Sequence, residues 1–100
     1  MRHPEHAVGV AYYAMLYAVR AALSEIGVVA KTHTGAWNRF AEHFARASRF
    51  DPELLTEARR LQGRREAIDY DAAIAPPPEA DEAIAVAERF VAAVADMLEE

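Results

Sequence analysis

The sequence contains no cysteine, which excludes a disulfide scaffold and any zinc site built on thiolates. It also lacks an apolar segment long enough to cross a membrane, because the run from Ala7 to Val19 ends at Arg20, short of the roughly 20 residues that a spanning helix needs. The first six residues mix basic and acidic side chains, unlike the basic start of a secretory signal. We therefore expect a cytoplasmic protein that does not contact a membrane.

What the sequence does contain is apolar and alanine-rich: hydrophobic residues make up 53% of its 100 residues. A chain of this length forms one domain with a modest core, since it hides somewhat more than about 60% of its unfolded surface on folding. We expect a single domain over residues 1–100, because no interdomain linker or internal repeat is visible.

The stretch Ala11–Leu23 has no helix breaker and is apolar almost all the way round, which predicts a helix inside a bundle over about residues 5–26, with Gly27 as its left-handed stop. At about 100° per residue, large side chains gather on one face and small ones on a second. The large set is Tyr12, Met15, Leu16, Val19, Leu23 and Ile26, and the small set is Ala7, Ala11, Ala14, Ala18 and Ala22. A third edge, formed by Tyr13, Tyr17 and Arg20, is predicted to line a cleft or an interface.

Three further helices are predicted. A short helix follows the connector 28–34, takes Thr34 as its N-cap, and carries on its core face Trp37, Phe40, Ala41 and Phe44. A third helix begins at Asp51-Pro52, where a capping residue precedes a proline at the first helical position, and runs to about residue 68 or 70 with Leu54, Ala58, Leu61 and Ile68 on one side.

The stiff break Pro76–Pro78 precedes the fourth helix, whose start is favoured by acidic residues from Glu79 onward. Its predicted apolar face is Ile84, Ala87, Val91, Val94 and Leu98, with Phe90 and Met97 beside it. Three long helices and one short one, joined by short connections, predict an all-α, up-and-down four-helix bundle.

The net charge of −5 is distributed unevenly. Residues 1–70 carry ten Lys/Arg and eight Asp/Glu, or +2, whereas residues 71–100 carry one and eight, or −7. Residues 30–65 alone carry eight basic and four acidic side chains, an excess of +4. This local excess could meet phosphate groups, although the overall acidity is not that of a dedicated nucleic-acid binder.

Arg65 is the most informative single residue, because a guanidinium cannot lose its charge and here falls on the same helical stripe as Leu54 and Leu61. Two readings stay open. Asp69, four residues later, forms an ion pair with Arg65, or the stripe opens into a cleft where Arg65 binds an anion such as a phosphate. Tyr70 lies about 140° around the helix from Arg65, so both face one cleft only if the helix bends or ends between them.

Other polar residues are weaker candidates. Arg64, one turn after Arg60, is read either as part of a solvated pair or as an edge that steers phosphates. Lys31 and His33, together with His43, form a second candidate site, against the alternative that His33 only caps a helix or lies on the surface. The sequence offers no carboxylate and histidine cluster with ligand spacing, so we expect no metal and no cofactor.

Three segments of the chain resemble the prokaryotic HEPN domain, a small helical domain often paired with a minimal nucleotidyltransferase. They are AYYAMLYAVR at Ala11–Arg20, KTHTG at Lys31–Gly35 leading to Phe40 and His43-Phe44, and REAIDYD at Arg65–Asp71. In the nucleases of this family an Arg followed after four to six residues by His cleaves RNA without a metal, at a site composed across a dimer. Arg65 matches that Arg, but Tyr70 stands in place of the His.

The resemblance has two further implications. Family members usually carry another long helix before the Ala-Tyr-Tyr segment, so an apolar face of the first helix is left to be covered by a homodimer or another intimate complex. The implied function is an interaction module that binds nucleotide or RNA, of toxin-antitoxin type, with a nucleotidyltransferase partner and a cleft that includes Arg65, Asp69 and Tyr70. A metal-independent ribonuclease and a purely structural dimerisation domain are the alternatives.

Overall fold

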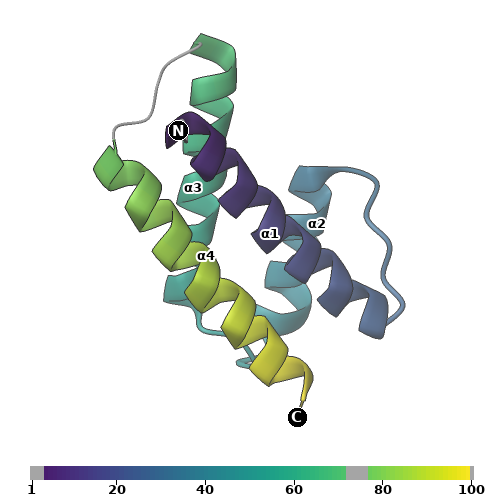
Figure 1. The fold of residues 1–100 in the computed structure, drawn as a ribbon. Helices are drawn as coiled ribbons and strands as arrows, with labels where there is room; N and C mark the ends of the chain where they lie inside the picture. Colours follow the sequence, from purple (N-terminus) through teal and green to yellow (C-terminus); the bar gives the residue numbers. More distant parts are fainter. Residues whose placement is uncertain (1–3, 72–76, 100) are drawn as a thin grey trace.

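The computed structural model describes residues 4–71 and 77–99, with side chains for residues 9–61 and 81–99. Along the chain follow α1 (Pro4–Glu25), α2 (His33–Phe40), the π-helical turn η1 (Ala41–Ala45), α3 (Pro52–Asp71) and α4 (Pro77–Leu98) (Figure 1). The predicted all-α class, with three long helices and one short one, is confirmed.

Helix α1 is the centre of the bundle, since it packs against α2, α3 and α4. In Figure 1, α1 and α4 lie side by side and run in the same direction, while α3 runs in the opposite direction behind them. Between α1 and α2 the connector of residues 28–32 turns back along α1 instead of leading away from it. The long apolar helix predicted from the sequence is therefore the helix against which the other three pack.

The core is built from the large face of α1 and an aromatic cluster. Phe90 of α4 has ring centroids of Trp37, Phe40 and Phe50 within 5.1 to 5.7 Å. The predicted large face of α1 is buried from Tyr12 to Leu23, and the predicted core residues Leu54, Ala58 and Leu61 of α3 are buried as well. Ile26 was assigned to the buried face wrongly: the helix ends at Glu25, and Ile26 is exposed in the turn that follows.

The helix ends follow local hydrogen-bonding rules, with one correction. Gly27, at φ +71°, ends α1 in a Schellman motif, in which Val28 N–H donates to the Leu23 carbonyl at 2.9 Å and Gly27 N–H to the Ser24 carbonyl at 3.0 Å. The predicted N-cap Thr34 is wrong. Thr32 is the cap, because its Oγ1 accepts the Gly35 N–H at 2.8 Å and the chain is already helical at His33.

The start of α3 matches the prediction, and the start of α4 does not. Asp51 Oδ1 accepts the Glu53 N–H at 2.9 Å, and α3 begins at Pro52. Helix α4 begins at Pro77 and not after the prolines. Proline is tolerated in the first helical turn because the backbone N–H groups of that turn have no partner within the helix.

The buried face of α4 is rotated from the predicted one. The residues buried along α4 are Ala83, Val86, Ala87, Phe90, Val94 and Met97. Val91 and Leu98, predicted to be inside, are 38% and 37% exposed, and Ile84 is half-buried. In an alanine-rich helix both rotations place apolar groups inside, so the packing of Phe90 against the aromatic cluster decides the face.

Candidate functional site

The main predicted site belongs to the C-terminal half of α3. Arg64, Arg65, Asp69 and Tyr70 all fall within its helical range, but their side chains lie outside the described part of the structure. The helix does not end between positions 65 and 70, because it continues to Asp71. A shared cleft for Arg65 and Tyr70 therefore stays a prediction.

The second predicted site, Lys31 and His33, lies against the tyrosine edge of α1. His33 is the first residue of α2, and its ring is 6.2 Å from the ring of Tyr12 and 6.2 Å, edge-on, from the ring of Tyr13. Both Lys31 and His33 are exposed. His43 does not join them, since it belongs to η1 beyond the far end of α2, about 15 Å along at 1.5 Å per residue.

The edge made of Tyr13, Tyr17 and Arg20 was predicted to line a cleft or an interface, and the structure shows how it is built. The rings of Tyr13 and Tyr17 are 6.3 Å apart, and Tyr17 is 67% exposed. Arg20 Nη1 donates to the carbonyl of Ala30 at 2.9 Å, which holds the connector against α1. The phenolic rings and the start of α2 thus form one continuous surface with the connector.

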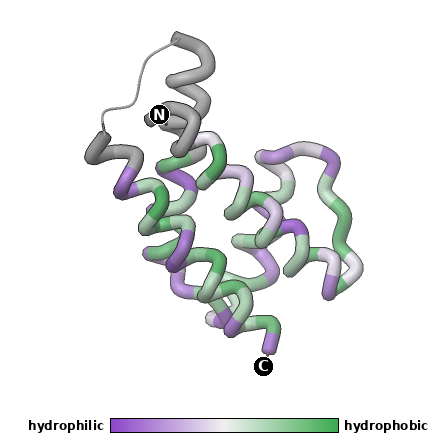
Figure 2. The backbone as a smooth tube through the Cα atoms, in the orientation of Figure 1, coloured by the Kyte–Doolittle hydropathy of each residue, from purple (hydrophilic) through white to green (hydrophobic). Residues whose placement is uncertain are grey.

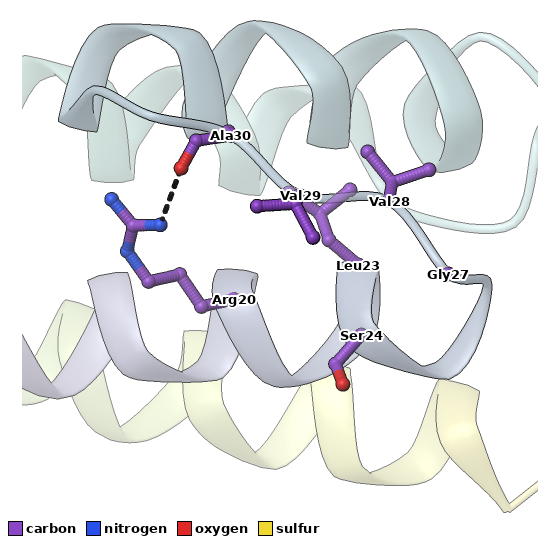
Figure 3. Close-up of a pocket in the computed structure, with 7 residues that line it drawn as sticks. All are labelled: Arg20, Leu23, Ser24, Gly27, Val28, Val29 and Ala30. Carbon is purple, nitrogen blue, oxygen red and sulfur yellow. Dashed lines mark hydrogen bonds between the residues drawn. The ribbon is translucent and has the colours of Figure 1, made fainter.

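A shallow pocket of about 230 Å³ lies between α1 and this connector (Figure 3). Its lining is Arg20, Leu23, Ser24, Gly27, Val28, Val29 and Ala30. Figure 3 shows the Arg20 side chain reaching across to Ala30, whereas the Ser24 side chain points away from the connector. No acidic side chain lines the pocket, so it suits an apolar group that carries a hydrogen-bond acceptor or a hydroxyl.

Sequence reasoning missed the connector as part of this surface. Val29 is 88% exposed, and Figure 2 shows the first part of the connector as a green, apolar segment that turns purple where it reaches α2. The signal was present in the run Val28-Val29-Ala30, which is unusually apolar for a loop. Only the Arg20 hydrogen bond to Ala30 places this run beside α1.

Several arginines of the basic middle segment already have partners inside the fold. Arg39 pairs with Glu42 at 3.1 Å, and Arg59 donates to Asn38 Oδ1 at 2.9 Å. Arg49 lies over the Phe44 ring, 5.2 Å from its centroid, and its Nη2 is 3.5 Å from the Met97 carbonyl. The bonds of Arg59 and Arg49 connect segments distant in sequence, whereas the Arg39–Glu42 pair is local to α2 and η1. Of the three, only Arg39 has its charge offset by a carboxylate.

Metal and membrane sites were searched within the described residues. There, no group of three or more His, Asp or Glu side chains is arranged to hold a metal ion. None of the helices in that part of the chain combines the length and apolar character that a membrane crossing requires.

Comparison with known proteins identifies the family. The HEPN domain profile matches residues 1–97, nearly the whole chain. The chain belongs to the HEPN domain family. This match covers all three segments on which the resemblance was based, including the Arg65–Asp71 segment at the end of α3.

Two curated proteins are similar in sequence to this HEPN chain. A protein of Methanocaldococcus jannaschii named "Putative toxin" is 34% identical over 70 residues, which is 70% of this chain and 48% of that protein. A UPF0332 protein of Gloeobacter violaceus is 39% identical over 54 residues, 51% of this chain and 43% of that protein. The chain thus spans less than half the length of these relatives. No solved structure matches it significantly.

Proposed function

We propose that this HEPN domain is the toxin-like component of a toxin-antitoxin type pair, works with a nucleotidyltransferase partner, and binds a nucleotide or RNA at the end of α3. The observation that carries the proposal is the family match over residues 1–97, which includes the segment from Arg65 to Tyr70. The toxin name of the archaeal relative supports the same class.

The roles within the proposed site follow from side-chain chemistry. Arg65 supplies a permanent positive charge with a planar set of donors that matches a phosphate, and Arg64 next to it steers anions toward the site. Asp69, four residues on, orients the guanidinium. Tyr70 presents a hydroxyl group to the partner, and that oxygen is the atom to which a nucleotidyl group from ATP is attached, with loss of pyrophosphate. Lys31 and His33 belong to a separate surface next to the tyrosines, where Lys31 contributes a positive charge.

We do not propose ribonuclease activity for this chain alone. No His follows Arg65 anywhere in the sequence, and a tyrosine, with an ordinary pKa near 10, is protonated at neutral pH and is a poor general base. An interaction and modification role needs only the charge at position 65 and the hydroxyl at position 70.

The test combines a growth assay with mass spectrometry. The chain is expressed alone and with a nucleotidyltransferase encoded by a neighbouring gene, and the purified pair is incubated with ATP and Mg²⁺. We expect growth arrest that the partner relieves, a complex on a sizing column, and a mass increase equal to a nucleotidyl group, lost in Tyr70→Phe. Arg65→Ala is expected to abolish growth arrest.

Arg46→Ala is the control, because Arg46 is an exposed arginine that lies outside α3 and the proposed site. The proposal is wrong if the pair forms no complex and gains no mass. If Arg65→Ala and Arg46→Ala arrest growth equally, position 65 carries no function. Cleavage of total RNA by the isolated chain, lost in Arg65→Ala, would instead support the ribonuclease alternative.

A further inference from the structure

Arg20 carries an uncompensated positive charge at the wall of a pocket. Arg39 and Arg89 each pair with a carboxylate, and Arg60 lines another described pocket together with two glutamates. Arg20 is half-buried, and within the described residues its partner is the backbone carbonyl of Ala30, with no carboxylate paired to it. A guanidinium cannot lose its charge. This position therefore favours an anionic ligand.

The bond to Ala30 fixes the guanidinium in one orientation. Nη1 donates to the Ala30 carbonyl at 2.9 Å, and a guanidinium carries further N–H donors on its other two nitrogens. Within the part of the chain that the structure describes, those further donors have no protein acceptor. A side chain already held in place loses little conformational freedom when a ligand binds. A planar carboxylate is the acceptor that such a fork of donors matches best.

The pocket of about 230 Å³ beside Arg20 has a charged end and an apolar end. Figure 3 shows the guanidinium at one end, with Leu23, Val28 and Val29 arranged from there toward Gly27. Arg20 is the one charged residue among those that line the pocket in the described structure. A ligand that matches both ends therefore carries a negative group on an aliphatic chain.

The dimensions of the pocket set the length of that chain. Drug-sized ligands occupy pockets of roughly 300 to 1,000 Å³, so the volume here suits a smaller molecule. From Arg20 to Ser24 the helix axis advances about 6 Å, a distance that about four or five bonded carbon atoms span. Val29 is 88% exposed, so a chain that covers it removes apolar surface from water.

The charge around the pocket also favours an anion. The whole chain carries a net charge of −5, but residues 9–33 carry Arg20 and Lys31 against Glu25, a net +1. Lys31 directly follows the connector residue Ala30 and is exposed. Glu25 ends α1 and is not among the residues that line the pocket. An anion near the connector therefore meets a locally positive surface on an acidic protein.

We propose that the pocket between α1 and the connector binds a short aliphatic carboxylate, with its carboxylate on the Arg20 guanidinium and its chain against Leu23, Val28 and Val29. Two sources supply this chemistry, a free branched-chain acid and the C-terminal residue of a polypeptide. The pocket is separate from the proposed site on α3. Ligand binding therefore tests it without reference to growth arrest or nucleotidyl transfer.

A nuclear magnetic resonance titration of the isotope-labelled chain measures binding at individual amides. At constant ionic strength we expect isocaproate to shift the amide signals of Val28, Val29 and Ala30 in a saturable way, with a Kd on the order of 1 mM. Isocaproamide has the same shape without the charge, and acetate has the charge without the chain. Each should bind at least about tenfold more weakly. The absence of a saturable shift up to about 20 mM isocaproate, or equal binding of the acid and its amide, would overturn the proposal.

Two substitutions test the two ends of the pocket. Arg20→Gln removes the charge but keeps a donor for the Ala30 carbonyl, so we expect isocaproate to bind at least about tenfold more weakly and isocaproamide to bind as before. Val29→Asn should weaken both ligands about fivefold. Val29 is largely exposed, so this replacement leaves the fold intact.

Val10→Asn is the matched control, because Val10 is also an exposed valine but does not line the pocket. Its Kd for isocaproate should stay within about twofold of the wild-type value. Unchanged binding of isocaproate by Arg20→Gln would overturn the charged end of the site. Equal effects of Val29→Asn and Val10→Asn would overturn the apolar end.

A tripeptide distinguishes the two sources of the carboxylate. Glycyl-glycyl-leucine carries the same branched chain and a carboxylate at a peptide terminus. Tighter binding than isocaproate, with shifts of the same amides, would assign the pocket to the C-terminus of a partner polypeptide. Equal or weaker binding would assign it to a free acid.

Discussion

Replacing Phe90 by alanine should remove the contact that joins α4 to the aromatic cluster of the core. Phe90 is fully buried, and its ring lies 5.5 Å from Trp37, 5.7 Å from Phe40 and 5.1 Å from Phe50, centroid to centroid. These partners come from α2 and from the turn before α3. Truncation therefore leaves a cavity walled by three aromatic rings, which cannot collapse without moving two chain segments.

The expected loss in the free energy of unfolding is about 3 to 5 kcal/mol, which is typical when a buried phenylalanine is truncated to alanine and leaves a cavity. A domain of this size has a total stability of roughly 5 to 15 kcal/mol, so Phe90→Ala should remain only marginally folded. Phe90→Leu keeps more of the volume and should lose about 1 to 2 kcal/mol. Val91→Ala is the control, because Val91 is the next residue along α4 but is 38% exposed, and we expect it to lose less than about 1 kcal/mol.

Urea unfolding at 25 °C measures these differences, followed by circular dichroism and by the fluorescence of Trp37, the sole tryptophan of the chain. Trp37 is fully buried beside Phe90, so its emission reports the same part of the core. The reasoning is refuted if Val91→Ala costs as much as Phe90→Ala, since α4 would then bury the face that the sequence pattern indicated.

Three further predictions concern local structure and the α3 site. Thr32→Ala should cost about 1 kcal/mol through loss of the Gly35 N–H bond, and Thr34→Ala much less; thermal unfolding of the two variants compares the candidate caps, and an equal loss would contradict the assignment. Gly27→Ala should lower stability by about 1 kcal/mol, because φ is +71° there while a new Cβ would meet no neighbour, so an unchanged melting temperature would argue against the left-handed turn. Arg65→Met should leave the melting temperature unchanged but abolish growth arrest; a gain in stability with function retained would instead indicate a structural ion pair with Asp69.

Local signals in the sequence were sufficient for the end of α1 and the start of α3. Asp51-Pro52 and Gly27 specify their boundaries through hydrogen bonds and backbone angles that involve only a few neighbouring residues. Thr32 and Thr34 show the limit of this reasoning. Both are capable caps, and the choice between them depends on where the connector places the first helical residue.

The rotation of α4 shows a different limit. Alanines alternate with larger apolar residues around this helix, so Val91 and Leu98 fit a buried stripe as well as Val86 and Met97 do. The sequence pattern locates the apolar side of this helix but not its exact rotation, and the aromatic cluster around Phe90 selects the buried face. For the candidate site on α3, the sequence gives the residue types and their spacing. A cleft shared by Arg65 and Tyr70 stays a prediction.

By itself, the sequence determined the all-α class, the four helices, the burial of the large face of α1 and the membership of the HEPN family, because these depend on short-range periodicity and on motifs along the chain. Only the tertiary structure placed the connector against α1 and put His33 next to Tyr13. It also formed the pocket between α1 and the connector. Such features arise from contacts between residues distant in sequence, whose mutual positions no local pattern encodes.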